Sequence, residues 1–303
     1  MTTDIKVLAV VVTYNRLEML KKCIGCLCKQ TVPCDILIID NHSTDGTGEY
    51  VRQLADERIS YADTGANLGG AGGFRYGMNM ACGMECDAAW VMDDDCLPEP
   101  DALEKLLEAG ELVGGAGAYG FISSAVLWTD GSECRINRQH IVKNAYEHVE
   151  WLKYGVVRVD QATFVSLLVP TDIIREFGLP IKEFFIWGDD IEYTQRIAVR
   201  GGKPCYLAGA STVIHAMKEN VGSDISLDSP EKIDRYRYGF RNERYALRKL
   251  GIKGRLLYDY RRLRDIGHII TRAKDHRLKR LGTVFAGAIQ GVFFFPKVEY
   301  PEK

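Results

Sequence analysis

The first hundred residues alternate short apolar runs with stretches in which apolar side chains recur every three or four residues. The apolar runs predict four buried strands, at residues 6–12, 35–41, 59–63 and 88–95. The stretches between them predict three helices, at residues 16–29, 46–55 and about 67–85. Strands and helices that alternate in this way build β-α-β units, so we expect an α/β fold with a mostly parallel, Rossmann-like sheet.

The pattern becomes less regular after residue 98. Apolar runs predict further strands at residues 121–128 and 162–170, with helices at 102–108 and 173–178. Residues 129–157 predict a hairpin-rich excursion, because Asp130 and Gly131 form a turn signal. An aromatic strand is expected from Phe184, followed by a helix that ends before Gly202. Beyond Ser229 we expect Arg-rich and Tyr-rich helices.

Composition and charge divide the chain into two parts. Its 303 residues are 46% hydrophobic and 26% charged, which is typical of a globular protein and excludes long disorder, collagen and coiled coil. Residues 231–303 hold 19 Lys and Arg against 8 Asp and Glu, whereas residues 1–230 hold 20 against 33. The basic C-terminal region predicts contact with an anionic partner, either nucleic acid or a lipid surface. A solvated tail or a dimer contact is the alternative.

Cysteines and targeting signals indicate a cytoplasmic protein. The nine cysteines are not spaced like a disulfide framework, and the group Cys23, Cys26 and Cys28 lacks the second paired cluster of a structural metal site. No secretory signal opens the chain. The longest apolar run, residues 281–295, is interrupted by Gln290 and is too short to span a membrane.

Polar side chains follow each predicted strand of the first half. Thr13 and Asn15 follow the first strand, Asp40 and Asn41 the second, and Asn67 lies beyond the third. An aspartate triplet, residues 93–95, ends the fourth strand. Ligands of open α/β sheets bind outside the carboxyl ends of the strands, so these positions predict a nucleotide pocket.

The triplet Asp93, Asp94 and Asp95 is the sharpest of these features. Residues two apart share a side of an extended turn, so Asp93 and Asp95 can face one ligand while Asp94 points elsewhere. Two carboxylates suit a Mg²⁺ or Mn²⁺ that bridges a diphosphate. A solvated acidic turn is the alternative.

Two further motifs carry candidate chemistry. NLGGAGGF, residues 67–74, matches a dinucleotide fingerprint poorly because Arg75 occupies its third glycine position. Its glycines let the backbone approach a sugar or phosphate, or they form a turn that only packs. WGDDIEY places Asp189 and Asp190 at the start of a helix. Capping explains one of these aspartates, and the second, beside Trp187, suits a general base that deprotonates a sugar hydroxyl.

His215 follows another strand-like run and is a candidate third metal ligand. A single histidine on an apolar strand is more often structural.

Taken together, TYNR, IDN, NLGGAGG, MDDD, WGDDIEY and the later histidine resemble the family 2 inverting glycosyltransferases, which have the GT-A fold. RYRYGFRNERYALRK, residues 235–249, resembles the Tyr-rich stretch after the catalytic domain of bacterial rhamnosyltransferases and galactofuranosyltransferases. The motifs are most similar to those of enzymes that use UDP-galactofuranose. This resemblance implies a catalytic domain at residues 1–230, with a nucleotide-sugar half (1–97) and an acceptor half (98–230), followed by a helical region, 231–303.

The resemblance also implies roles for single residues. The nucleotide-sugar residues would be Thr13, Asn15, Arg16, Asp40, Asn67, Gly69, Gly70 and Asp94. Asp93, Asp95 and His215 would hold Mn²⁺ or Mg²⁺. Asp190 would be the base, with Asp189 as the open alternative, and Trp187 would contact the acceptor.

We therefore expect a metal-dependent transfer of galactofuranose from UDP-galactofuranose to a hydroxyl of a glycan or a polyprenyl-diphosphate-linked acceptor. The alternatives are a dTDP-rhamnose enzyme and, from another class, a non-catalytic module that binds nucleotide-sugars or nucleic acid. The paired aspartates and the metal set argue against a pure binding module, so we expect no nucleic-acid partner; a homo-oligomer is left open.

The basic region would lie on the inner face of the cell membrane through residues 231–303, because cationic helices bind anionic leaflets. Its arginines recur every three or four residues with aromatic residues between them: Arg235, Arg237, Arg241, Arg244 and Arg248, with Tyr236, Tyr238, Phe240 and Tyr245.

Overall fold

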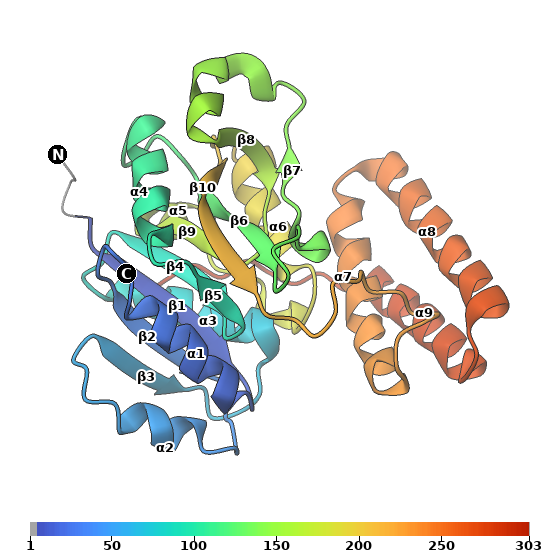
Figure 1. Cartoon of the computed structure of the whole chain (residues 1–303). Helices are drawn as coiled ribbons and strands as arrows, with labels where there is room; N and C mark the ends of the chain where they lie inside the picture. Colours follow the sequence, from blue (N-terminus) through green and yellow to red (C-terminus); the bar gives the residue numbers. More distant parts are fainter. Residues whose placement is uncertain (1–4, 303) are drawn as a thin grey trace.

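A computed structural model describes residues 5–302, without the side chains of residues 145–147 (Figure 1). One sheet runs through the N-terminal two thirds of the chain, in the order β3-β2-β1-β4-β9-β6-β10-β8-β7, with β5 paired to β10. Its strands are β1 (Val7–Thr13), β2 (Asp35–Asp40), β3 (Ile59–Asp63), β4 (Ala88–Asp93), β5 (Cys96–Pro98), β6 (Ile122–Trp128), β7 (His140–Ile141), β8 (Val156–Gln161), β9 (Leu167–Pro170) and β10 (Tyr206–His215). Strands β3, β2, β1 and β4 are parallel, whereas β9 runs antiparallel to both β4 and β6.

Helices cover both faces of this sheet and form a separate group at the C-terminal end (Figure 1). They are α1 (Leu17–Leu27), α2 (Thr47–Arg52), α3 (Gly69–Gly83), α4 (Ala102–Leu112), α5 (Thr171–Phe177), α6 (Asp189–Gln195), α7 (Tyr236–Arg248), α8 (Gly251–Arg272) and α9 (Arg277–Val292). The expected α/β class with parallel central strands is confirmed, and so are the C-terminal helices.

One expectation about local structure is wrong. The aromatic stretch before α6 is not a strand, because residues 182–184 form a 3₁₀ helix and Phe185 and Trp187 have positive φ angles of 62° and 67°. The excursion at 129–157 does contain the expected turn at Asp130 and Gly131, where Leu127 and Glu133 pair antiparallel, and its short strand β7 pairs antiparallel with β8, with two 3₁₀ segments in the same range. Aromatic side chains favour strands on average, but here tertiary contacts determine the backbone.

Alternation along β1 explains the two layers of core. Val7, Ala9 and Val11 point to the face covered by α1, where they pack with Leu20. Leu8, Val10 and Val12 point to the opposite face and pack against Phe74 and Met78 of α3. Both faces of the parallel half are therefore buried, as continuous apolar strand sequences require.

Strand register brings distant polar residues to one edge. Thr13 pairs with Asp40 at the end of β2, and Val12 pairs with Asp93 at the end of β4. Strands β6 and β4 both pair antiparallel with β9, so they run in the same direction. Strand β10 is parallel to β6, and its last residue, His215, therefore lies at the same edge. The candidate residues of four strands therefore meet at the carboxyl edge of the sheet.

Helices α7, α8 and α9 pack together beside this edge. Tyr236 and Phe240 of α7, Ile269 of α8 and Val284 of α9 form a small apolar core, and Trp187 packs against it. No helix in the described part of the chain is long and apolar enough to cross a bilayer. Both the helical group and the sheet thus contact the segment that precedes α6.

The start of α3 touches that segment closely. Gly69 has a φ of 72°, and a Cβ atom there would lie 2.1 Å from the backbone oxygen of Phe185. The Ala71 amide donates a hydrogen bond of 3.2 Å to the same oxygen. Only glycine fits position 69, because a side chain would displace backbone rather than a flexible group.

Replacing this glycine should therefore destabilise the protein. We expect Gly69→Ala to lower the free energy of unfolding by about 2 kcal/mol or more, from the strained φ and the backbone clash together. Gly70→Ala is the matched control, because a Cβ there meets nothing within 4 Å. Urea unfolding of both variants measures the difference. Equal midpoints for Gly69→Ala and the wild type would show that the close approach is absent.

Candidate active site

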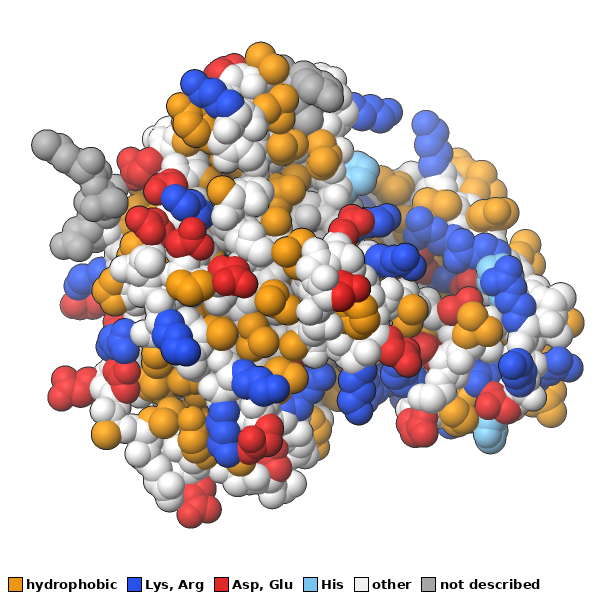
Figure 2. Space-filling view, viewed as in Figure 1, with side chains coloured by type: hydrophobic (Ala, Val, Ile, Leu, Met, Phe, Trp, Pro, Cys, Tyr) orange, Lys and Arg blue, Asp and Glu red, His pale blue; other side chains and the backbone are white. Residues whose placement is uncertain are grey.

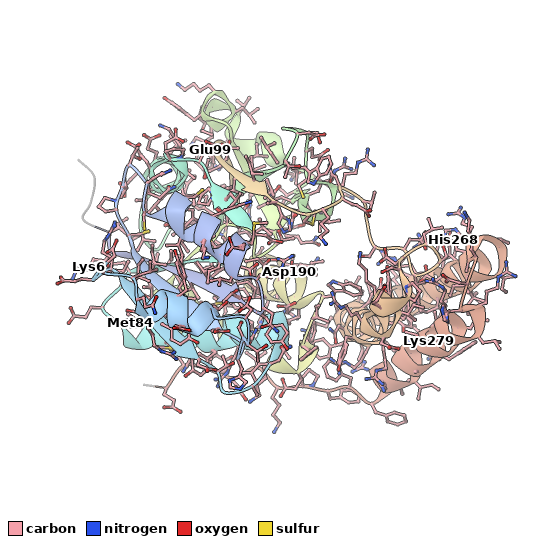
Figure 3. All side chains as sticks on the ribbon, turned by 60° about the horizontal axis from the view of Figure 1, so that its bottom comes forward. Lys6, Met84, Glu99, Asp190, His268 and Lys279 are labelled. Atoms are coloured by element: carbon pink, nitrogen blue, oxygen red, sulfur yellow. The ribbon has the colours of Figure 1, made fainter. Side chains whose placement is uncertain are left out.

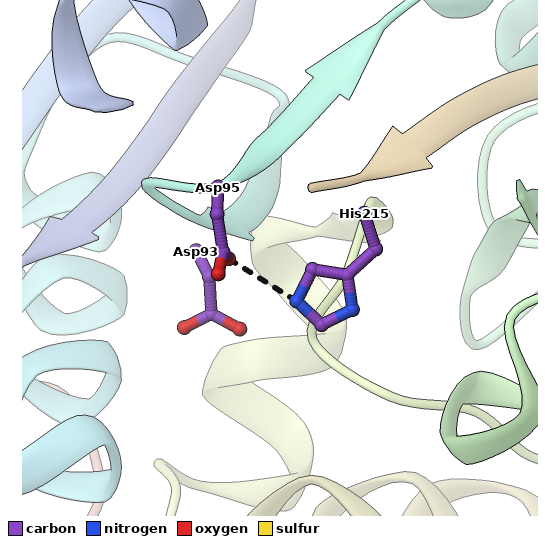
Figure 4. Close-up of side chains that lie close together, drawn as sticks. All are labelled: Asp93, Asp95 and His215. Carbon is purple, nitrogen blue, oxygen red and sulfur yellow. Dashed lines mark hydrogen bonds and ion pairs between the residues drawn. The ribbon is translucent and has the colours of Figure 1, made fainter. Parts of the chain in front are cut away.

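A tight turn after β4 carries the aspartate triplet. Strand β5 follows the turn directly and pairs antiparallel with β10, so that Cys96 lies opposite His215. This pairing brings the Asp95 carboxyl to 3.1 Å from Nε2 of His215 (Figure 4). Carboxylate oxygens of Asp93 and Asp95 and a ring nitrogen of His215 all lie within 4.8 Å of one another. We call these three residues the Asp-Asp-His cluster.

The middle aspartate is bonded to the end of β1. Asp94 is buried, accepts a hydrogen bond of 2.7 Å from the Thr13 hydroxyl and accepts one of 2.9 Å from Arg16. The same Arg16 nitrogen lies 2.6 Å from Asp95. Arg16 therefore ties the loop after β1 to the loop after β4, and its nitrogen is shared by Asp94 and Asp95, whereas Asp94 is not part of the Asp-Asp-His cluster.

Carboxylates outnumber cations at this edge. Arg16 and His215 stand against Asp93, Asp94 and Asp95, and the Asp93 carboxyl has no hydrogen bond or ion pair within the described part of the chain. Desolvation, together with the charge of Asp95, raises the pKa of Asp93 to about 8. At neutral pH the Asp93 carboxyl is therefore mostly protonated, and it would ionise once a further cation lay beside it.

The bonded pair beside it is ionised. Burial would raise the pKa of Asp95, but its hydrogen bond to His215 and the charges of His215 and Arg16 lower this pKa to about 2. Burial would lower the pKa of His215, but the hydrogen bond to Asp95 raises it to about 10. A proton on His215 therefore supplies charge that a metal ion could supply instead.

The residues present fit a divalent metal. Ligands of one octahedral ion lie about 3 Å apart, so only small side-chain movements separate the Asp-Asp-His cluster from a ligand set. Two carboxylates and one imidazole suit Mn²⁺ or Mg²⁺. The unpartnered Asp93 would give up its proton on binding such an ion.

A residue that the sequence did not indicate orients the histidine. Asn137 is buried, and its side-chain oxygen lies 2.7 Å from Nδ1 of His215. Its amide donates to the Thr163 hydroxyl at 2.9 Å, which fixes the direction of the carbonyl. Nδ1 of His215 therefore keeps its proton, and Nε2 is directed to Asp95. Asn137 lies in the irregular 129–157 excursion, where no periodic signal marks it.

Asp189 and Asp190 begin α6 as predicted. Asp190 is partly exposed, and it accepts a hydrogen bond of 2.7 Å from the Ile191 amide. Figure 3 shows Asp190 on the side of the sheet that faces the C-terminal helices. The charge of Asp190 contributes to the raised pKa of Asp93, and the charge of Asp93 contributes to the raised pKa of Asp189. This carboxyl pair therefore lies near the Asp-Asp-His cluster.

The two carboxyls of the pair differ in protonation. Desolvation and the charge of Asp190 raise the pKa of the buried Asp189 well above its usual value. Desolvation raises the pKa of Asp190 only to about 6. Asp190 is therefore the carboxyl of the pair that ionises more readily, and neighbouring carboxyls whose pKa values differ can take different roles.

The Trp187 ring is not fully exposed for stacking on a sugar, because it packs against α7. Its ring packs edge-on against Tyr236, with centroids 5.0 Å apart, and a Cβ at Gly239 would lie 3.0 Å from it. The side chain is half-buried between α6 and α7. Trp187 therefore joins the active-site edge to the C-terminal helices, with part of its surface left exposed.

The other predicted nucleotide residues line the loops of this edge. Asn15 accepts a hydrogen bond from the Thr44 amide, and Asn67 accepts one from the Gly69 amide. Asp40 is buried, and its two oxygens accept hydrogen bonds from the Ser43 amide and the Tyr61 hydroxyl, both at 2.8 Å.

Asp40 thus holds the loop after β2 rather than presenting a free carboxylate. Gly70 lies in the first turn of α3 with open space around it.

Helix α7 uses part of its predicted basic face for packing, whereas Arg235 and Arg237 at its start are exposed. Arg248 donates to the backbone oxygens of Gly291 and Phe294, and Arg244 stacks on Tyr258. Tyr236 and Phe240 are buried in the small C-terminal core. The regular spacing reflects packing of α7, and the exposed apolar residues lie on α8 and α9 instead.

Comparisons with known proteins agree with this geometry. Residues 8–122 match the sequence model of Glycosyl transferase family 2. Galactofuranosyltransferase GlfT1 of Mycolicibacterium smegmatis is 25% identical over 311 residues, which cover 93% of this chain and 98% of the relative. Galactofuranosyltransferase GlfT1 of Mycobacterium tuberculosis is 27% identical over 301 residues, which cover 91% and 95%. An undecaprenyl-phosphate mannosyltransferase of Micrococcus luteus is 34% identical over 110 residues, or 34% and 44% of the two chains.

Two solved structures share the fold. GalNAc-T7, crystallised with UDP, GalNAc and Mn²⁺, superposes with a TM-score of 0.59 at 14% identity, over 77% of this chain and 48% of that one. TarS of S. aureus gives 0.58 at 12% identity, over 91% and 55%. The chain spans about half the length of these two structures. Residues 8–122 thus resemble the sequences of glycosyltransferase family 2, and the chain has the GT-A fold that these solved structures share.

Proposed function

We propose that this protein is an inverting, metal-dependent galactofuranosyltransferase that uses UDP-galactofuranose. One observation carries the proposal: a single sheet edge brings together the Asp-Asp-His cluster and a carboxyl pair with one ionised member. Similarity to galactofuranosyltransferases over more than nine tenths of the chain supports the choice of sugar. No such similarity supports dTDP-rhamnose as donor.

Asp190 acts as the general base. An acceptor hydroxyl attacks the anomeric carbon from the face opposite the diphosphate, the bond from that carbon to the phosphate oxygen breaks, and the hydroxyl proton passes to Asp190. One displacement of this kind inverts the anomeric centre and releases UDP. Burial and the charge of Asp190 raise the pKa of Asp189, which favours Asp190 over Asp189 as the carboxylate that takes the proton.

Asp93, Asp95 and His215 would hold Mn²⁺ or Mg²⁺. The ion would supply Lewis-acid and electrostatic stabilisation of the charge on the leaving diphosphate. The Mn²⁺ and UDP in the GalNAc-T7 structure support a metal and a uridine nucleotide in this fold. Arg16, half-exposed next to Asp95, would add positive charge on the nucleotide side.

A glycan on a lipid carrier is the proposed acceptor. The name of the Micrococcus relative includes undecaprenyl-phosphate, which supports a polyprenyl carrier. The surface of α8 fits a bilayer, because exposed apolar side chains form one stripe along it, at Ile252, Leu256, Tyr260, Leu263 and Ile270. Lys253 and Arg255 lie next to the stripe, and basic side chains gather over the C-terminal helices (Figure 2). An apolar stripe with basic borders is the pattern of helices that lie on anionic membranes.

A donor panel tests the proposed activity. With Mn²⁺ and a soluble galactofuranosyl acceptor, we expect transfer from UDP-galactofuranose and none from dTDP-rhamnose. Asp190→Asn should lower kcat by about 10³-fold or more while UDP binding stays within threefold, because only the base is lost. The wild-type kcat should fall as pH falls through about 6, since protonation of Asp190 removes the base.

Other outcomes identify the alternatives. Transfer from dTDP-rhamnose alone would establish the rhamnosyltransferase, and nucleotide-sugar binding without turnover of any donor would establish a binding module. Full turnover by Asp190→Asn would contradict the assignment of the base.

The membrane proposal predicts selective vesicle binding. The wild type should sediment with phosphatidylglycerol vesicles and not with phosphatidylcholine vesicles. Leu256→Ser with Leu263→Ser should weaken this binding about tenfold or more, because two apolar anchors are lost. Leu227→Ser is the matched control, since Leu227 is 64% exposed but lies outside the stripe. Equal binding to both vesicle types would disprove the lipid surface.

A further inference from the structure

The segment that leads into the carboxyl pair has an unusual backbone. In residues 184–188, Phe185, Trp187 and Gly188 have φ angles of 62°, 67° and 85°. Two of these residues carry large side chains, for which the left-handed region is unfavourable. Such a turn persists only where its surroundings hold it, and it directly precedes Asp189 and Asp190.

One buried side chain of α7 binds this turn at three points. Asn242 is 1% exposed, and its Nδ2 lies 2.9 Å from the oxygen of Phe184, 3.1 Å from that of Ile186 and 2.9 Å from that of Trp187. The amide has two hydrogens, so three carbonyl oxygens share them. The Phe184 oxygen also accepts from Arg241 and from the Ile186 amide, whereas without Asn242 the oxygens of Ile186 and Trp187 would lose the side-chain donor that they share.

Neighbouring residues of α7 complete the contact. Arg241 donates to the Phe184 oxygen at 3.2 Å, and the rings of Tyr238 and Phe185 lie 5.0 Å apart. Gly239 leaves space for the Trp187 ring. The start of α3, at Gly69, closes the other side of the turn. The turn is therefore held between α3 of the sheet domain and α7 of the C-terminal helices.

The chemistry of the contact selects asparagine. The groups that face position 242 from the turn are all carbonyl oxygens, so the side chain must donate. Aspartate has the same shape but presents oxygens to oxygens, and alanine removes the side-chain donor to the oxygens of Ile186 and Trp187. Asn242 stands in the stretch RYRYGFRNERYALRK that the sequence associated with the basic surface.

We propose that Asn242 is a positioning residue for the transfer reaction. It holds the 184–188 turn in its strained form and thereby directs the carboxyl pair of α6 towards the acceptor hydroxyl. The inference rests on the proposed role of Asp190 as base. It makes α7 a part of the catalytic apparatus, in addition to any role of the C-terminal helices at a membrane.

Helix α7 offers a matched control for a purely structural role. Arg248 also donates to three backbone oxygens, those of Gly291, Val292 and Phe294, at 2.6, 3.3 and 3.0 Å. These oxygens belong to the end of α9 and the residues after it. Arg248→Ala therefore loosens the packing of the C-terminal helices without removing a contact to the 184–188 turn.

The experiment compares Asn242→Asp, Asn242→Ala and Arg248→Ala with the wild type and Asp190→Asn in the full chain. Hydrogen exchange reports on residues 184–192, and steady-state kinetics with UDP-galactofuranose and a soluble acceptor give kcat, KM and their pH dependence. We expect both Asn242 variants to exchange faster in this segment and to lose about 10²-fold in kcat, with donor KM within threefold, because misplacement of about 1 Å costs that much. Arg248→Ala should keep the wild-type kcat and exchange in the turn.

The midpoint of the pH profile near 6 is a second readout. In the Asn242 variants it should move, because the burial of Asp190 depends on the turn, whereas a loss of folded protein alone would lower kcat at every pH equally. Faster exchange in the turn with a wild-type kcat would overturn the positioning role. Equal losses in the Asn242 and Arg248 variants would overturn it too, since stability alone would explain them. Full activity of Asp190→Asn would instead overturn the proposed base, whatever the Asn242 variants do.

Discussion

Three carboxyl groups crowded at the end of β4 are the constraint on which the site depends. Three consecutive aspartates leave an apolar strand, and within the described residues Arg16 and a protonated His215 are the cations that pair with them. Asp94 and Asp95 have partners, and Asp93 has none within the described residues. The Asp93 carboxyl therefore keeps its proton at neutral pH, and a bound cation with its anionic ligand would take the place of that proton.

Several elements bring partner residues to the aspartate triplet. Strand β5 reverses directly after the triplet and pairs with β10, which delivers His215 from 120 residues further along the chain. Asn137 fixes the ring from an irregular segment. On the opposite side, the turn at 184–188 sets the carboxyl pair near the cluster, and it does so with support from both α3 and α7. The Asp-Asp-His cluster and the carboxyl pair are thereby both held by contacts between elements far apart in the sequence.

The sequence pattern predicted the functional residues at the ends of strands. It did not predict the residues whose hydrogen bonds hold those side chains and turns in place. Asp93, Asp95 and the start of α6 follow apolar or helical patterns, so local periodicity marks them. Asn137 and Asn242 act across 78 and 55–58 residues respectively, and no local pattern encodes such contacts.

The strand predicted at residues 184–187 was wrong for a related reason. Their β propensity predicted a strand, whereas contacts with Asn242 and Gly69 hold them in a left-handed turn. The spacing of arginines in α7 correctly predicted a helix, but not that Arg244 and Arg248 face other helices rather than solvent.

The most direct measurement of the central claim is Mn²⁺ binding in the presence of UDP. Titration followed by electron paramagnetic resonance should show one tight site in the wild type. Replacing both Asp93 and Asp95 by asparagine should weaken that site by about 100-fold or more and abolish transfer, because two of the three ligands lose their charge. Unchanged Mn²⁺ affinity in the double variant, or full transfer by the wild type in excess chelator, would contradict the account.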